Sequence, residues 1–303
     1  DRAGARRVRS RRRGRPVTPR LVWVDVFASA PLTGNPLAVV LEADGWETER
    51  MRSLAAELGL SETVFALPPA AGGDAALRIF TPASELPVAG HPVVGAAWVL
   101  HHAGRAPARA RLETGAGPLE VRVRGEVATM EQPPPRRGPE VDAAEVAAAL
   151  GTAAAPAPAA RVWSTGVPQL MLPVPGVAAL EGVRPDHPAL ERLGERDGWL
   201  GVSAFAVEGD GGGRLRARVR HFAPRLGVPE DPVTGSAAGA LGACLADAGH
   251  GEGDHLELVV DQRTAAGRGG EVAVRVDRGG GAPARVRVGG RVTPVLEGIL
   301  TLP

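Results

Sequence analysis

Two short segments of the chain pair a glycine with a polar residue at the start of an apolar stretch. These pairs are Gly90 with His91, and Gly235 with Ser236. The first turn of a helix has free N–H groups and the positive end of the helix dipole, so it attracts anions. Two such ends facing each other across a cleft would hold a small carboxylate better than a nucleotide, because neither segment has a glycine-rich phosphate loop. The alternative is that the glycines only permit tight turns and close helix packing.

Four residues in or before these segments can do chemistry. His91 at a helix start would be held neutral by the dipole and could hydrogen-bond a substrate, although a histidine can also simply fill a core position. Asp231 lies five residues before Ser236, and an aspartate before proline is also typical of a turn. Ser61 and Glu62 follow a predicted helix end, where such residues usually cap or solvate a turn. Their types alone therefore give a weak signal.

The glycine–polar pairs belong to a longer internal repeat. Residues 85–104 and 230–249 align without a gap and share seven of twenty residues. The pattern Thr-Gly-x-Pro occurs at residues 33–36 and again at residues 165–168. A duplicated structural unit explains both matches, whereas the alternative is coincidence in a chain rich in Ala, Gly, Pro and Val.

The elements around these segments are predicted to be mostly β-strands with one central helix in each half. Both repeat segments continue as almost uniformly apolar helices, which should be buried on all sides. A shorter amphipathic helix capped by Thr48 is predicted to end at Gly59, and another is capped by Asp142. The proline-rich residues 133–140 break regular structure. They predict two domains, residues 21–135 and 136–303, with a last strand that can return to the first domain.

The remaining composition restricts the class of protein. Residues 1–20 contain nine arginines and one acidic residue but no aromatic residue to stack on bases. We therefore expect a disordered leader, with a nucleic-acid-binding arm as the less favoured alternative. No apolar run approaches the roughly 18 residues that cross a bilayer, and no signal peptide is evident, which predicts a soluble cytoplasmic protein without membrane partners.

Cysteine and histidine usage argues against metal and thiol chemistry. The chain has one cysteine, Cys244, which excludes an intrachain disulfide and a thiol-based metal cluster. The seven histidines form no H-x-x-x-H pattern. We therefore expect no metal site and no cofactor.

Four segments resemble, in the same order, the signature segments of the phenazine-biosynthesis PhzF-like isomerase family: LVWVDVFASAPLTGNPLAVV, GLSETVFAL, FTPASELPVAGHPVVGAA and HFAPRLGVPEDPVTGSAAGAL. The resemblance spans residues 21 to about 270 and ends weakly in DQRTAAGR. It implies an α+β fold like that of diaminopimelate epimerase, with two pseudo-symmetric domains, each a barrel or half-barrel wrapped around a central helix. It also implies a homodimer and an active site in the cleft between the domains.

The resemblance assigns roles to individual residues. It places the catalytic glutamate at Glu62, with His91 and Asp231 as its catalytic partners, and it places the substrate-binding positions at Ser61, Gly90, Gly235 and Ser236. Related epimerases carry a cysteine before each helix-start glycine, where this chain has Ala89 and Thr234. A two-thiol racemase is therefore excluded, and a carboxylate must move the proton.

These observations predict a cofactor-independent isomerase that moves a proton on a small carboxylate-bearing metabolite, with Glu62 as general acid and base. The alternative is a non-catalytic relative that binds small acids in the same cleft.

Overall fold

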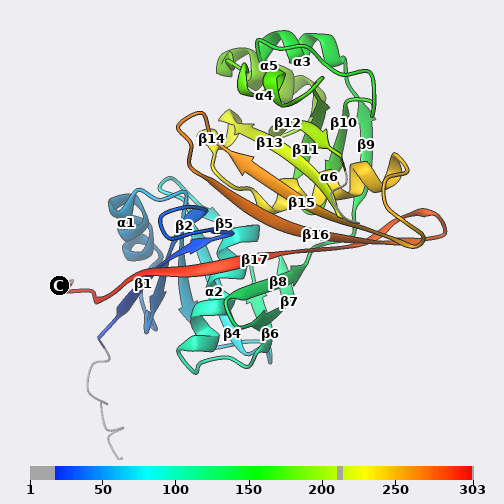
Figure 1. The fold of residues 1–303 in the computed structure, drawn as a ribbon. Helices are drawn as coiled ribbons and strands as arrows, with labels where there is room; N and C mark the ends of the chain where they lie inside the picture. Colours follow the sequence, from blue (N-terminus) through cyan, green and yellow to red (C-terminus); the bar gives the residue numbers. More distant parts are fainter. Residues whose placement is uncertain (1–17, 210–213, 302–303) are drawn as a thin grey trace, which may run out of the picture.

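The structure, a computed structural model, describes residues 18–209 and 214–301 (Figure 1). The arginine-rich leader predicted over residues 1–20 therefore lies outside the described residues, except for its last three. Of these, Arg20 already opens the first strand. Among the described residues, no helix is long and apolar enough to span a membrane.

The N-terminal half is a closed barrel of eight strands around one buried helix, α2 (Gly90–His102). Each strand pairs with the next around the ring, and the last, β8, pairs with β17, which returns to β1. The strands in ring order are β1 (Arg20–Val26), β2 (Asn35–Leu41), β3 (Glu62–Leu67), β4 (Ala75–Phe80), β6 (Arg109–Thr114), β7 (Gly117–Arg124), β8 (Val127–Glu131) and β17 (Ala282–Ile299). The short β5 (Glu85–Leu86) and helix α1 (Thr48–Leu58) complete this half.

The C-terminal half arranges a second set of strands around another buried helix, α6 (Gly235–Asp247). Its strands are β9 (Arg136–Glu140), β10 (Arg161–Ser164), β11 (Pro168–Pro173), β12 (Gly201–Glu208), β13 (Leu215–Ala223), β14 (Val228–Asp231), β15 (His255–Arg263) and β16 (Gly269–Gly279), which pairs with β17. A group of helices covers the outer face of this sheet (Figure 1): α3 (Ala143–Ala149), α4 (Val177–Glu181) and α5 (His187–Asp197), with the 3-10 turn η1 (Pro224–Leu226) beside them.

Strand β17, drawn in red in Figure 1, belongs to both halves. Its first part pairs with β16, its middle part pairs with β8, and its last part runs antiparallel to β1 as far as the Arg20–Ile299 pair. One continuous backbone ladder therefore fixes the two halves relative to each other.

Small residues allow the strands to close around the two central helices. A Cβ atom on Gly95 of α2 would lie 2.5 Å from the Leu37 side chain, and one on Gly242 of α6 would lie 2.7 Å from Val274. Such distances are shorter than van der Waals contact, so these positions require glycine. Buried residues of both helices belong to one continuous hydrophobic core.

The structure confirms some of the predicted helix ends and corrects others. Gly59 ends α1 in the left-handed conformation (φ 62°), and the Asp142 carboxylate caps α3 by accepting a 2.9 Å hydrogen bond from the Ala144 amide. The prediction that Thr48 caps α1 is wrong. Glu47 holds that position, and the Thr48 hydroxyl instead accepts a hydrogen bond from Arg78.

The C-terminal half contains more regular structure than the sequence patterns predict. Helices α4 and α5 are additional to the predicted elements, although the Asp186 carboxylate caps α5 and Gly198 ends it, both of which are ordinary helix signals. The proline-rich residues 133–140 were expected to break regular structure, yet they contain strand β9, which pairs with β10. Proline is tolerated at such a position because an edge strand leaves one side of its backbone unpaired.

Candidate active site

Glu62 and His91 face each other at the N-terminal ends of β3 and α2. Glu62 is the first residue of β3, directly after the turn that follows α1, and His91 is the second residue of α2. The Glu62 Oε2 atom lies 3.4 Å from His91 Nε2, and the two side chains are 16% and 7% exposed. Both atoms are buried without a hydrogen-bond partner among the described residues. Buried polar atoms are rarely left unpaired, so two that face each other indicate a place for a ligand.

Burial changes the charge state of both groups. It raises the pKa of Glu62 to about 7, an effect that a hydrogen bond with Ser61 partly opposes. It lowers the pKa of His91 to about 4, against a smaller opposing effect of the Asp231 carboxylate. Near neutral pH, Glu62 can therefore both accept and release a proton, while His91 is a neutral imidazole.

Asp231, the last residue of β14, is held by hydrogen bonds from three directions. Its Oδ1 atom accepts a 3.0 Å bond from Asn35 Nδ2, and its Oδ2 atom accepts one from the Thr234 hydroxyl. Its backbone carbonyl accepts a 2.7 Å bond from Gln262. Burial raises the pKa of Asp231 to about 6, while the nearby His91 and the hydrogen bonds from Thr234 and Asn35 oppose this rise.

The N-termini of α2 and α6 lie against each other. A Cβ atom on Gly90 would be 3.4 Å from the Ser236 amide nitrogen, and one on Gly235 would be 4.0 Å from the His91 amide nitrogen. No side chain caps either helix, so the first-turn N–H groups of both are free of such a bond. Two uncapped helix ends at one place provide N–H donors and positive dipole ends for a carboxylate.

The structure thus brings together residues from both halves that the sequence patterns singled out. Glu62 and His91 lie 3.4 Å apart, and the charges of both influence the pKa of Asp231. Ser61 precedes Glu62, and its hydroxyl donates a 3.1 Å hydrogen bond to Asn35 Oδ1. Gly90, Gly235 and Ser236 form the facing helix ends described above.

Three supporting residues were not predicted from the sequence. Asn35 contacts both Ser61 and Asp231, and Gln262 contacts Asp231 and Thr234. Thr165 donates a 3.2 Å hydrogen bond to the Ser236 carbonyl and so fixes the start of α6. Asn35 and Thr165 both belong to the Thr-Gly-x-Pro repeat, which was the available signal.

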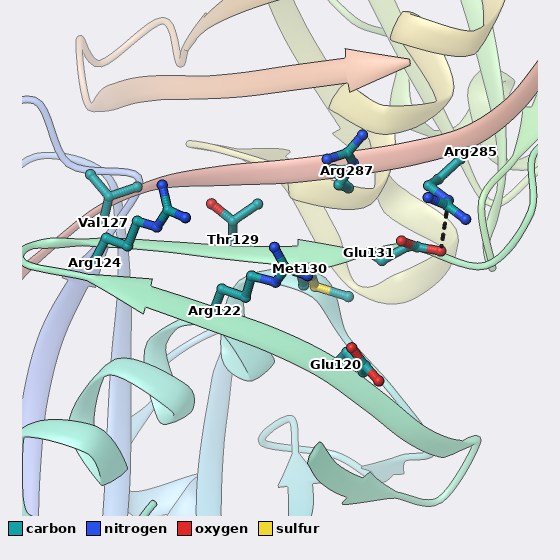
Figure 2. Close-up of a pocket in the computed structure, with 9 residues that line it drawn as sticks. All are labelled: Glu120, Arg122, Arg124, Val127, Thr129, Met130, Glu131, Arg285 and Arg287. Atoms are coloured by element: carbon teal, nitrogen blue, oxygen red, sulfur yellow. Dashed lines mark ion pairs between the residues drawn. The ribbon is translucent and has the colours of Figure 1, made fainter. Parts of the chain in front are cut away.

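A hollow lined by strand residues is drawn in Figure 2. It is formed by β7, β8 and β17, and none of the seven predicted site residues lines it. Two of its four arginines are engaged in ion pairs, Arg285 with Glu131 at 3.4 Å and Arg287 with Asp277. None of its lining residues is a buried acid or base, so this hollow is not a candidate active site. Among the described residues, no cluster of His, Cys, Asp and Glu is arranged to hold a metal ion.

Known proteins are similar to this chain in sequence and in fold. Residues 24–298 match the family model described as phenazine biosynthesis-like protein. The trans-2,3-dihydro-3-hydroxyanthranilate isomerase of Pseudomonas chlororaphis is 38% identical over 93% of this chain and 99% of its own length. The enzyme of the same name from Pseudomonas aeruginosa is 39% identical over 92% of this chain and 98% of its own length.

Solved structures agree with this relationship. The phenazine biosynthesis protein of the PhzF family from Bacillus anthracis superimposes with a TM-score of 0.85 at 27% identity, covering 94% of this chain and all of that one. A probable proline racemase from Agrobacterium radiobacter shares only the fold, with a TM-score of 0.65 at 16% identity. The α+β architecture of two similar halves, the matching family model and the similarity along almost the whole chain lead to one assignment: the chain belongs to the phenazine biosynthesis-like (PhzF) family and is an isomerase.

Proposed function

We propose that the protein isomerises a small, unsaturated carboxylic acid by moving a proton between two of its carbon atoms, without a cofactor, and that Glu62 moves the proton. The observation that carries this proposal is the pair of unpartnered atoms, Glu62 Oε2 and His91 Nε2, 3.4 Å apart beside two uncapped helix ends. A carboxylate bound by the helix ends would place the rest of its carbon skeleton next to Glu62.

The proposed reaction balances without any other reactant. Ionised Glu62 takes a proton from one carbon of the substrate, the electron pair of that C–H bond delocalises into the conjugated system, and the double bonds shift. The same carboxyl then returns the proton to another carbon on the same face. A pKa of about 7 suits both steps, because a group that must accept and then donate a proton works best near the ambient pH.

The other site residues hold the substrate and stabilise its charge. Neutral His91 can donate a hydrogen bond to the developing anion, and Asp231 can orient an amino or hydroxyl group. The N–H groups of Gly90, Gly235 and Ser236 would bind the carboxylate, and Ser61 would position Glu62. Curated relatives are named as isomerases of trans-2,3-dihydro-3-hydroxyanthranilate, so a cyclic, unsaturated amino acid is the substrate class that we propose first.

Turnover in heavy water tests this mechanism. With trans-2,3-dihydro-3-hydroxyanthranilate or a related cyclic acid, the wild-type protein should show a solvent or substrate isotope effect, or should incorporate deuterium into the product. Glu62→Gln should reduce turnover by at least about 10³-fold, since an amide cannot carry the proton. Glu57→Gln, on the exposed face of α1, is the matched control and should retain wild-type turnover. Unchanged turnover in Glu62→Gln would contradict the proposal.

The second candidate function is binding of small acids without catalysis. The uncapped helix ends would support it equally well, because anion binding does not need Glu62. A library of small acids separates the two functions: an acid that raises the melting temperature but is never consumed indicates a binding protein.

We also propose that the protein forms a homodimer, which the family resemblance implies. Light scattering coupled to size-exclusion chromatography would show twice the 31.2 kDa chain mass if this is correct.

A further inference from the structure

Asn35 hydrogen-bonds to site residues of both halves. It is the first residue of β2, is 1% exposed, and lies beside Ser61 in the N-terminal half and Asp231 in the C-terminal half. Its Nδ2 atom donates to Asp231 Oδ1 at 3.0 Å and to the Val233 carbonyl at 2.9 Å, and its Oδ1 atom accepts from the Ser61 hydroxyl at 3.1 Å. All three hydrogen bonds are therefore made inside the protein.

The orientation of this amide follows from its partners. The Val233 carbonyl can only accept a hydrogen bond, so the NH₂ group of Asn35 must face it, and the carbonyl oxygen must face Ser61. The second N–H of the same NH₂ group then points to Asp231, and the Ser61 hydroxyl must donate to Asn35. The direction of every bond in the chain Ser61–Asn35–Asp231 is fixed.

These hydrogen-bond directions have opposite effects on the pKa values of the Asp231 and Glu62 carboxyl groups. An N–H donor stabilises the ionised form of Asp231, and its hydrogen bond is among the causes that lower the pKa of this group. The Ser61 hydroxyl has a single proton, which it donates to Asn35 Oδ1. A hydrogen bond from Ser61 lowers the pKa of Glu62, so donation to Asn35 weakens that effect. Asn35 thus favours charge on Asp231 and disfavours it on Glu62. Two carboxyl groups in one site need such a difference if one is to exchange protons while the other stays ionised.

The position of Asn35 is itself fixed from the C-terminal half. Gly34, directly before it, has a positive φ of 73° and donates a 2.7 Å hydrogen bond to the Gly269 carbonyl. The Arg268 guanidinium donates to the Gly34 carbonyl at 3.0 Å and pairs with the buried Asp25 carboxylate at 2.8 Å. The turn that presents Asn35 is therefore tied to the strand pair β15–β16.

We propose that Asn35 is a positioning residue that joins Ser61 and Asp231 across the interface between the two halves and so keeps Glu62 and Asp231 in different protonation states. The inference rests on the proposed function, because it assigns a purpose to this difference, but the hydrogen-bond chain can be tested without any substrate. The titratable groups that face the Asp231 carboxyl are Glu62 on β3 and His91 on α2, and both must be followed in the test.

The test is a pH titration of the full chain, with ¹³C labels in the aspartate and glutamate carboxyl groups and the histidine rings, followed by NMR. Signals of Asp231 and Glu62 are assigned by their loss in Asp231→Asn and Glu62→Gln. In Asn35→Ala the pKa of Asp231 should rise by about one unit, because a charge-assisted hydrogen bond is lost, and that of Glu62 should fall. The two values should then approach or cross each other.

Two further variants separate the effect of the Ser61–Asn35 hydrogen bond from that of the Asn35–Asp231 hydrogen bond. Ser61→Ala removes the hydroxyl proton and leaves the Asn35–Asp231 hydrogen bond in place, so it should leave the pKa of Asp231 unchanged. The double variant Asn35→Ala with Ser61→Ala should lose the fall in the pKa of Glu62 seen in Asn35→Ala, because the released hydroxyl is gone. Should Asn35→Ala fail to fold by circular dichroism, Asn35→Asp keeps the shape of the side chain. Its added carboxylate should raise the pKa of Asp231 further.

The outcomes distinguish this inference from the proposed function. If the pKa values shift as expected but no small acid is turned over, the positioning role stands and the proposed reaction fails. If a folded Asn35 variant shows Asp231 and Glu62 titrating as in the wild type, the positioning role is overturned, whatever its activity. If the protein turns over a substrate, the acidic limb of the pH–rate profile of Asn35→Ala should shift to lower pH, because it follows the pKa of Glu62.

Discussion

Glu62 and Gly201 occupy matching register positions in the two halves. In the parallel pair of β2 and β3, Leu37 lies opposite Glu62, and in the corresponding pair of β11 and β12, Gln169 lies opposite Gly201. A Cβ atom on Gly201 would lie 2.5 Å from Gln169 Oε1 and 2.8 Å from the His221 ring. The space for a side chain at this position is therefore filled, and the duplicated fold carries an acid on one side only.

Gly201→Ala should destabilise the protein by about 1–3 kcal/mol, the usual cost of forcing atoms into a packed core. Urea unfolding measures this loss. Gly298→Ala is the matched control, because Gly298 is also a strand glycine, yet a Cβ there meets nothing within 4 Å. Adding Gln169→Ala to Gly201→Ala should recover part of the loss. Equal stability of the two single variants would show that the space beside Gly201 is not filled.

The pH–rate profile should show the ionisation of Glu62. Because the reaction begins with ionised Glu62 and burial raises its pKa to about 7, kcat/KM should increase with pH and level off above about pH 7. A steady-state assay between about pH 5 and 9 measures this limb. A limb near the ordinary glutamate value of 4.5 would contradict the assignment of a buried general base.

Glu62→Gln should stabilise the protein at alkaline pH while removing its activity. The folded-state pKa of Glu62 is raised above the unfolded value of 4.5 to about 7, so the folded protein binds a proton that the unfolded chain has released. The wild type therefore loses stability as the pH rises from about 4.5 to about 7, and the substitution removes this loss because an amide does not titrate. The gain should reach about 3 kcal/mol above pH 7.

Denaturant unfolding at about pH 5 and about pH 8 checks this pH dependence. The difference between Glu62→Gln and wild type should be larger at the higher pH, whereas Glu57→Gln on the surface should show the same difference at both values. A difference for Glu62→Gln that is larger at the lower pH would have the wrong sign for a carboxyl whose pKa is raised.

Arg268→Ala should weaken the connection between the two halves. It leaves the buried Asp25 carboxyl without its 2.8 Å partner and removes the bond to the Gly34 carbonyl, so we expect a loss of about 2 kcal/mol. A double-mutant cycle with Asp25→Asn tests the cause. The double variant should be more stable than Arg268→Ala alone, and strictly additive effects would show that the two side chains do not interact.

Much of the candidate site could be predicted from residue types and their order. The starts of α2 and α6 followed from a glycine before an apolar run, and the repeat correctly indicated two similar halves. Helices α4 and α5, which connect β11 to β12 as α1 connects β2 to β3, were not predicted, although Asp186 and Gly198 mark the ends of α5. The strand β9 was missed because its pairing with β10 overrides a local sequence that favours a turn.

Most elements of this protein and the residues able to do chemistry followed from the sequence alone, because helix starts, apolar periodicity and the types of Glu62, His91 and Asp231 are local properties. Which of these residues come into contact depends on the packing of distant segments. Asn35 and Asp231 are 196 positions apart and touch because the two halves share β17. Distant segments must also come together to bury Glu62 and so raise its pKa. The same is true of the packing that leaves no space for a side chain at Gly201.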